Sequence, residues 1–237
     1  MQKQQQKTWK NLLEISRSPT RHCKLCFKEI NDYSFYNFSH KENILCEECF
    51  GAFKAKFINF KIQHYDALAI YDYDETMKKL IYTFKGCYDY ELKDVFLSRY
   101  INYLRLQYHD YVMVGAPSSE IDDLKRGFNH VKEMFSCLGL PMFNVIKKIS
   151  KEKQSSKSSK NRLKINDALV SENISNLNGK KVLIVDDIYT TGATVFKMIE
   201  LTKEAKPKDI KILVVAKTID LDKRDLNDKK RIFAKLY

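Results

Sequence analysis

One stretch, Lys181 to Thr194, constrains the fold of this chain more than any other. A run of valine, leucine and isoleucine ends in two carboxylates, Asp186 and Asp187. A polar loop follows, and apolar residues then return at helical spacing, so the stretch predicts a buried strand, a loop and a helix. In open α/β sheets, ligands bind beyond the carboxyl ends of the strands. We therefore expect the two acids to lie at a ligand site.

The loop after the acids has the composition of an anion-binding loop. Thr190, Thr191 and Thr194 supply hydroxyls, Gly192 allows the backbone to approach a ligand closely, and Ala193 stands where a helix begins with free amides. Two carboxylates beside such a loop suit a ligand with hydroxyls at one end and a phosphate at the other, such as ribose 5-phosphate. The alternative is a simple helix cap, which requires neither the paired acids nor the glycine.

Length and composition favour one packed α/β domain with a small appendage. The chain has 237 residues, of which 44% are hydrophobic. Its 42 Lys and Arg outnumber 30 Asp and Glu by 12, which suits phosphorylated ligands and single-stranded DNA, although lysine-rich usage can also reflect genome composition. We find no transmembrane or signal-peptide run. The sequence predicts a cytoplasmic protein, with any membrane association made through partners.

Four cysteines predict a metal site near the N-terminus. Cys23 and Cys26 form one C-x2-C knuckle, Cys46 and Cys49 form another, and nineteen residues separate the two. This spacing is typical of a structural Zn²⁺ site with four thiolates, in which no position remains for a reactive water. Two disulfides or a redox dithiol pair are the alternatives, and disulfides are disfavoured in a cytoplasmic protein. We place this zinc ribbon in residues 1–60.

Between the ribbon and the acids, apolar spacing predicts several elements. Residues 51–64 show the pattern of an amphipathic helix, 65–73 that of a strand leading into a helix, 91–107 that of a long helix, and 111–114 that of a second core strand. Arg126 precedes the next helix, where it either grips an oxyanion or takes part in capping. Residues 147–164 hold eight Lys or Arg and one Glu, which predicts a mobile basic loop or a solvated linker.

The acid stretch resembles the signature of the type I phosphoribosyltransferases. The resemblance implies that Asp186 and Asp187 contact the ribose hydroxyls of phosphoribosyl pyrophosphate (PRPP), and that residues 190–194 bind its 5′-phosphate, with Mg²⁺ assisting. It also implies a type I phosphoribosyltransferase-like α/β fold in residues 61–237, with a parallel sheet and helices on both faces.

The order of motifs is similar to that of the ComF (ComFC) family. The motifs are the cysteine knuckles, Phe84-Lys85, Pro117, Arg126-Gly-Phe-Asn129, Gln154, Arg162 and the acid stretch. The chain departs from the family pattern in three ways. Gly115 stands where the usual Val-Pro-x-Pro loop has its first proline, Asp122 and Asp123 precede Arg126, and His130 replaces a common Gln. Carboxylates near a pyrophosphate weaken its binding unless a cation intervenes.

The family resemblance implies a role in the uptake of single-stranded DNA, and two functions remain open. In one, the chain is an adaptor that retains a ribose-phosphate pocket and works with a ComFA-type ATPase translocase and a recombination mediator of the DprA type. In the other, it is an active phosphoribosyltransferase in which Asp186 or Asp187 stabilises charge developing on the ribose. The sequence shows no evident pocket for an acceptor base, which favours the adaptor.

Overall fold

The computed structural model describes residues 21–30, 44–149 and 168–218. The chain divides into two compact units, Met1–Ala52 and Phe53–Tyr237. The first contains α3 (Glu47–Ala52), which begins within the second cysteine knuckle and includes Cys49. Tyr33, Phe35, Tyr36 and Phe38, between the two knuckles, lie outside the described residues. Among the described helices, none has the length and apolarity that crossing a bilayer requires.

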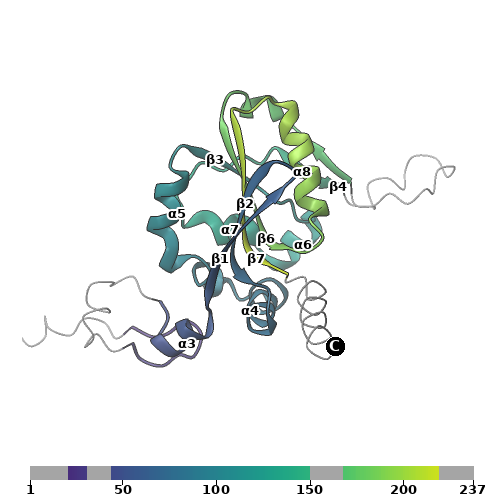
Figure 1. Cartoon of the computed structure of the whole chain (residues 1–237). Coiled ribbons are helices and arrows are strands. Elements are labelled where there is room, and N and C mark those ends of the chain that lie inside the picture. The colour runs from purple at the N-terminus through teal and green to yellow at the C-terminus, as the bar shows by residue number, and fades with distance from the viewer. Residues whose placement is uncertain (1–20, 31–43, 150–167, 219–237) are drawn as a thin grey trace, which may run out of the picture. The chain divides into compact units, whose positions relative to one another are not determined.

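The second unit is built on a five-stranded sheet with the order β1-β2-β7-β6-β3 (Figure 1). The strands are β1 (Ala55–Ile62), β2 (Tyr65–Asp72), β3 (Tyr111–Gly115), β6 (Lys181–Tyr189) and β7 (Asp209–Lys217). Only β1 runs antiparallel to its neighbour. A separate antiparallel pair joins β4 (Ile146–Ile149) to β5 (Ala168–Ser171). The predicted α/β fold with a mostly parallel sheet is confirmed.

Helices lie on both sides of this sheet. In Figure 1, α5 (Ile101–Tyr108) and α7 (His130–Ser136) lie to one side and α8 (Ala193–Glu204) to the other. Arg105 on α5 donates from Nε to the carbonyl oxygen of Leu138, just after α7, at 3.0 Å. The remaining helical segments are α4 (Glu75–Gly86), α6 (Glu120–Arg126) and the short 3₁₀ turns Tyr90–Asp94, Ser98–Tyr100 and Ile174–Leu177.

The core is formed by the two central strands, which are covered on both faces. Residues 182–185 of β6 and 212–216 of β7 are all 0% exposed. Such uninterrupted burial explains why the sequence shows continuous apolar runs here and not alternation. The carboxyl ends of β2, β7, β6 and β3 meet at one edge of the sheet because these strands are parallel.

The helix predicted for residues 51–64 is wrong. Residues 55–62 of this stretch form β1, which pairs with β2, and α3 ends before it, at Ala52. The pairing register shifts between Ala55 and Ile58, and Phe57 at this irregularity has a positive φ of 47°. A bulge moves the following side chains to the other face of the strand, so the apolar residues acquire a spacing that imitates a helix.

The long helix predicted for residues 91–107 is interrupted. Two 3₁₀ turns precede α5, which begins only at Ile101. Val95, Phe96 and Leu97 are buried consecutively, at 5%, 1% and 0% exposure. Three successive buried residues point in different directions around a helix, so a one-sided helix cannot bury them all.

Candidate functional site

The acid pair, Asp186 and Asp187, lies at the carboxyl edge of the sheet. Both residues belong to β6, where Asp186 is opposite Val214 of β7. The strand extends to Tyr189, so the acids are held by the sheet and not by the loop beyond it. The end of β3 lies alongside, because the backbone N–H of Ala116 donates to the carbonyl oxygen of Val185 at 2.8 Å. The predicted strand is therefore present but longer than expected.

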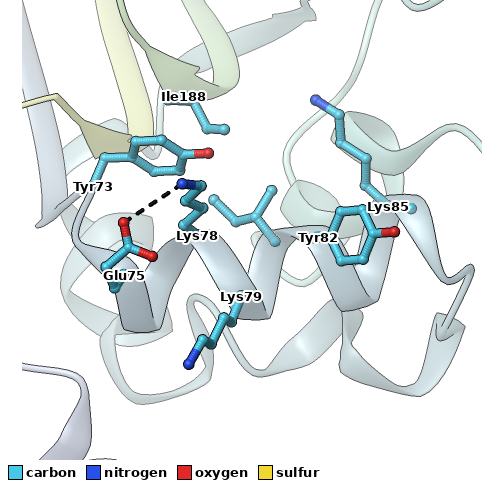
Figure 2. A pocket seen from close by; sticks show the side chains of 9 residues that line it. Tyr73, Glu75, Lys78, Lys79, Tyr82, Lys85 and Ile188 are labelled. Atoms are coloured by element: carbon cyan, nitrogen blue, oxygen red, sulfur yellow. Dashed lines mark hydrogen bonds and ion pairs between the residues drawn. The ribbon is translucent and has the colours of Figure 1, made fainter.

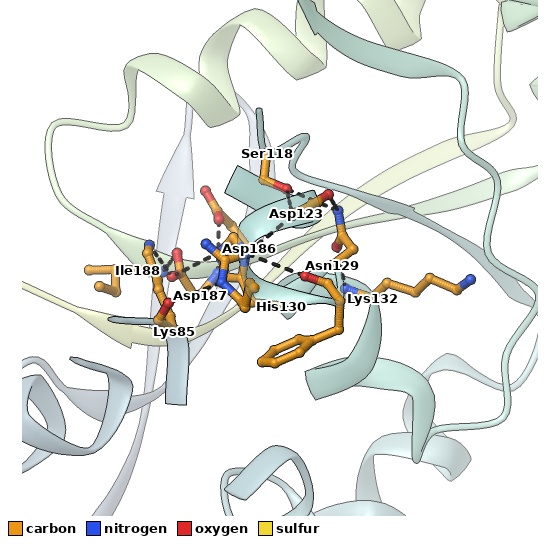
Figure 3. A network of polar contacts seen from close by, with 11 residues as sticks. Lys85, Ser118, Asp123, Asn129, His130, Lys132, Asp186, Asp187 and Ile188 are labelled. Atoms are coloured by element: carbon orange, nitrogen blue, oxygen red, sulfur yellow. Dashed lines mark hydrogen bonds and ion pairs between the residues drawn. The ribbon is translucent and has the colours of Figure 1, made fainter. Parts of the chain in front are cut away.

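Asp187 is a buried, ionised carboxylate. It is 5% exposed, and its Oδ2 accepts from Lys85 Nζ at 2.7 Å and lies 3.3 Å from His130 Nε2 (Figure 3). Its Oδ1 accepts from the backbone N–H of Ile188 at 2.8 Å. Burial alone raises its pKa, but the hydrogen bond from His130 and the charge of Lys85 outweigh burial and hold the pKa well below its usual value.

Asp186 has the opposite electrostatic character. It is 8% exposed, and its Oδ1 accepts from the backbone N–H of Asp187 at 2.8 Å. Burial, and then the neighbouring charge of Asp187, raise its pKa well above the usual value. The two carboxylates therefore oppose each other's ionisation, and Asp187, which faces Lys85 and His130, ionises more readily than Asp186. Such a pair suits the hydroxyls of a sugar.

The tautomer of His130 follows from its two neighbours. Arg126 Nη1 lies 3.1 Å from His130 Nδ1, and a guanidinium only donates, so Nδ1 accepts. The proton of the neutral ring is then on Nε2, which donates to Asp187. Arg126 itself has a side chain only 7% exposed, and its Nε donates to the carbonyl oxygen of Lys85 at 3.0 Å. Arg126 is therefore hydrogen-bonded to protein groups, and its link to the acid pair runs through His130.

Helix capping in this motif is performed by Asn129 and not by Arg126. Its Oδ1 accepts from the backbone N–H of Lys132 at 2.9 Å, at the start of α7. Its Nδ2 donates to Asp123 Oδ2 at 2.8 Å and to Ser118 Oγ at 3.1 Å. Ser118 also donates to Asp123, and Arg126 Nη1 lies 3.1 Å from the same carboxylate. Arg126 thus supplies the positive charge that offsets the Asp123 carboxylate near the expected pyrophosphate position.

In the loop Thr190–Thr194, which we call the phosphate loop, the threonines are exposed and Gly192 is buried. Gly192 has φ of 76°, and a Cβ at this position would collide with the side chain of Tyr189. The N-cap residue of α8, Gly192, offers no side chain, and the hydroxyl of Thr191 accepts from the backbone N–H of Ala193 at 3.4 Å. Among the described residues no group accepts from the backbone N–H of Thr191 or Gly192. A twelve-residue helix that begins beside these two amides is suited to a phosphate.

Beyond the acids, the loop after β3 lines a cavity of about 340 Å³. Its walls include Pro117 and Ser118 from that loop and three lysines, Lys132, Lys147 and Lys148. Lys147 and Lys148 come from the segment predicted as a basic loop, and both lie in β4. Residues 150–164 of that segment lie outside the described residues.

The four cysteines of the first unit lie together. Their sulfur atoms are all within 4.8 Å of one another, and Cys26 Sγ lies 3.6 Å from Cys46 Sγ. Four ligands about 2.3 Å from a tetrahedral zinc are about 3.8 Å apart, so the set fits a Zn²⁺ ion. The backbone N–H of Lys24 donates to Ile44 at 2.9 Å and ties the two knuckles together.

The electrostatics of the cysteines also fit a cation. Burial opposes ionisation of Cys23, but hydrogen bonds from the backbones at Cys46, Cys26 and Leu25 lower its pKa to about 6. Burial and the neighbouring thiols raise the pKa of Cys49. Without a positive ion, crowded thiols cannot all ionise, and a Zn²⁺ ion at their centre removes this conflict. Four cysteine ligands would fill a tetrahedral site, so a Zn²⁺ ion bound here would have a structural role.

Comparisons with known proteins agree with this geometry. Residues 124–236 match the phosphoribosyl transferase domain family. A competence protein ComFC from Streptococcus pneumoniae is 33% identical over 143 residues, which are 60% of this chain and 64% of that protein. ComFC from Bacillus subtilis is 30% identical over 128 residues, which are 53% of each chain. This chain therefore carries a match to the phosphoribosyl transferase domain and is similar to ComFC proteins.

This chain spans between about half and two thirds of the length of these curated relatives. Among solved structures, a purine phosphoribosyltransferase from Pyrococcus horikoshii matches 54% of this chain and 86% of its own, with 19% identity and a TM-score of 0.33. The names of the two curated relatives associate those proteins with competence.

Two residues of this site are not among the predicted site residues. Lys85 precedes Asp187 by 102 positions, and no spacing rule joins them. His130 stands out in the sequence only as a replacement for Gln. The signal that points to both is the order of motifs, since Phe84-Lys85 and the residues from Arg126 onward belong to the pattern that resembles the ComF family. Their contact with the acid pair requires the folded sheet.

Proposed function

We propose that this protein binds the ribose 5-phosphate part of PRPP and takes part in handling single-stranded DNA during its uptake by competent cells. The observation that carries the proposal is the acid pair, which lies at the carboxyl end of β6, just before the loop in which the backbone N–H groups of Thr191 and Gly192 have no acceptor among the described residues. The sugar hydroxyls would bond to Asp186 and Asp187, and the 5′-phosphate to Thr190–Thr194.

The rest of PRPP has a place in the same site. A pyrophosphate group fits the lysine-lined cavity next to the loop after β3. We expect Mg²⁺ to enter on the pyrophosphate oxygens, as is usual for this ion, which binds through substrate phosphates and retains waters. Arg126 and His130 keep Asp187 ionised and oriented without themselves contacting the ligand.

In DNA uptake the protein acts as an adaptor. Its net charge of +12 favours single-stranded DNA, and its partners are a ComFA-type ATPase translocase and a recombination mediator of the DprA type. The names of the curated relatives support the link to competence, and the resemblance to the ComF family suggests the two partners.

A second candidate function is phosphoribosyl transfer itself. It is favoured by the ionised Asp187, because a fixed negative charge stabilises the positive charge that develops on a ribose ring when pyrophosphate leaves. Release of pyrophosphate from PRPP in the presence of added bases tests this function, and complete absence of release would leave the adaptor alone.

Calorimetry tests the ligand site. Wild-type protein should give Mg²⁺-dependent heat with millimolar PRPP, and the double variant Asp187→Asn, Thr191→Ala should give none while retaining its circular dichroism spectrum. Asp66→Asn is the matched control, because Asp66 is exposed and pairs with Lys61 at the other edge of the sheet. No Mg²⁺-dependent heat with the wild type would refute PRPP binding.

A further inference from the structure

A second cavity opens beside the acid pair and has a different character. It measures about 450 Å³ and is formed by one face of α4 and by Ile188, the residue after Asp187 (Figure 2). Tyr73, Ile81, Tyr82 and Ile188 supply its aromatic and apolar walls. This volume is within the range of small-molecule sites, and the combination of apolar walls with few polar groups is typical of them. We call it the α4 cavity.

The ring of Tyr82 is an exposed aromatic surface in the wall of this cavity. The residue is 66% exposed, an unusual environment for a large aromatic side chain on a helix. Its ring lies beside Gly86, where a Cβ would be only 2.9 Å from a ring carbon, so the glycine makes room for the ring. An exposed ring of this kind is a stacking surface for a base.

Positive charge surrounds the same cavity. Lys78, Lys79 and Lys85 line it, and Glu75 is the only acidic residue among the described residues of its wall. Glu75 pairs with Lys78 at 3.5 Å, but both side chains are more than half exposed, so the pair is weak. Lys85 is already engaged by Asp187. Lys78 and Lys79 therefore remain available to a backbone phosphate.

We propose that the α4 cavity receives one nucleotide of single-stranded DNA, with its base stacked on Tyr82 and its flanking phosphates near Lys78 and Lys79. This inference rests on the proposed role in DNA handling and gives that role a location. The walls show no group arranged to distinguish one base from another, so the cavity accepts all four bases. Aromatic stacking combined with lysines is the usual form of such sequence-independent binding.

Binding of a fluorescent oligo-dT to the full-length, zinc-loaded protein tests the location. Tyr82→Leu removes the stacking surface and should weaken binding about fivefold or more, whereas Tyr82→Phe keeps the ring and should bind like the wild type. Lys78→Gln with Lys79→Gln should lower the slope of log affinity against log salt by about 1.4, the contribution of two phosphate contacts to a single strand.

The matched charge control is Lys206→Gln with Lys208→Gln. These residues line a different cavity at the amino ends of the strands, near the start of β7, and the substitutions remove the same charge. They should change the slope less than the α4 pair does. Equal effects of the two double variants would overturn the location and leave DNA binding intact. Equal affinity of Tyr82→Leu and wild type would do the same.

Two further outcomes separate this inference from the proposed function. Absence of oligo-dT binding by the wild type at low salt would overturn both the location and the direct role in DNA handling. The calorimetry with PRPP tests the ribose-phosphate site independently of this result. A wild type that binds free adenine, with loss of adenine binding but not of oligo-dT binding in Tyr82→Leu, would assign the cavity to a free base and overturn the proposal.

Discussion

Replacing Lys85 with Met should leave the buried carboxylate of Asp187, on β6, without its cationic partner and should therefore destabilise the protein. Lys85 Nζ lies 2.7 Å from Asp187 Oδ2, and Asp187 has 7% side-chain exposure. Removing one partner of a fully buried ion pair costs about 3–5 kcal/mol. Two facts reduce this value here: the Lys85 side chain is 40% exposed, and Asp187 keeps its bonds to His130 and the Ile188 backbone. We expect a loss of about 1–2.5 kcal/mol at neutral pH.

The dependence on pH distinguishes lost charge from lost packing. The low pKa of Asp187 in the folded protein contributes stability that is present above the unfolded value, about 3.9, and disappears as pH falls through the folded value. Without Lys85 the folded pKa rises, so part of that stability is missing at neutral pH. As pH falls and Asp187 takes up a proton in the variant, the gap between wild type and variant should narrow.

Urea unfolding followed by far-ultraviolet circular dichroism at several pH values measures this gap. Lys78→Met is the matched control, because Lys78 lies on the same helix and its partner Glu75 is exposed. It should change the free energy of unfolding by no more than about 0.5 kcal/mol at any pH. A gap for Lys85→Met that is equally wide at neutral and acidic pH would refute the electrostatic argument and assign the loss to packing.

Two other predictions concern the zinc ribbon and the histidine. Purified protein should contain about one zinc ion per chain, and Cys46→Ser should lose metal and melt earlier, because the bound ion contributes folding free energy; unchanged metal content by elemental analysis would contradict the site. His130→Leu should destabilise the second unit by about 1–3 kcal/mol in urea unfolding, because Arg126 Nη1 and Asp187 each lose a buried partner. His130→Gln should recover part of this loss, and equal losses in both variants would show that hydrogen bonding is not the cause.

The sequence contained enough information for the central strands and for the position of the acids. Val182–Val185 and Ile212–Ala216 are apolar without interruption because both faces are covered, and such runs are recognised without knowing their partners. Asp186 and Asp187 stand out because carboxylates interrupt one of these runs. These signals are local, and the fold preserves them.

Where the signal was not local, sequence reasoning failed or was incomplete. The bulge at Phe57 disguised β1 as a helix, and only its pairing with β2 reveals it. The sequence leaves the role of Arg126 open between gripping an anion and capping, because one of its partners, Lys85, is 41 positions away and becomes a neighbour only when α4 and α6 are assembled. The α4 cavity was not foreseen for the same reason.

The order of the strands has a consequence for the synthesis of this protein. Strand β2 pairs with β7, and its last residue, Asp72, is opposite Lys217, which the ribosome adds 145 residues later. At about 5–20 residues per second, this takes roughly 7–30 seconds. During that interval β2 has β1 on one edge and no partner on the other. Until β7 is synthesised, the hairpin of β1 and β2 therefore has an unpaired apolar edge. Pairing of β2 with so distant a strand should be a slow step of folding.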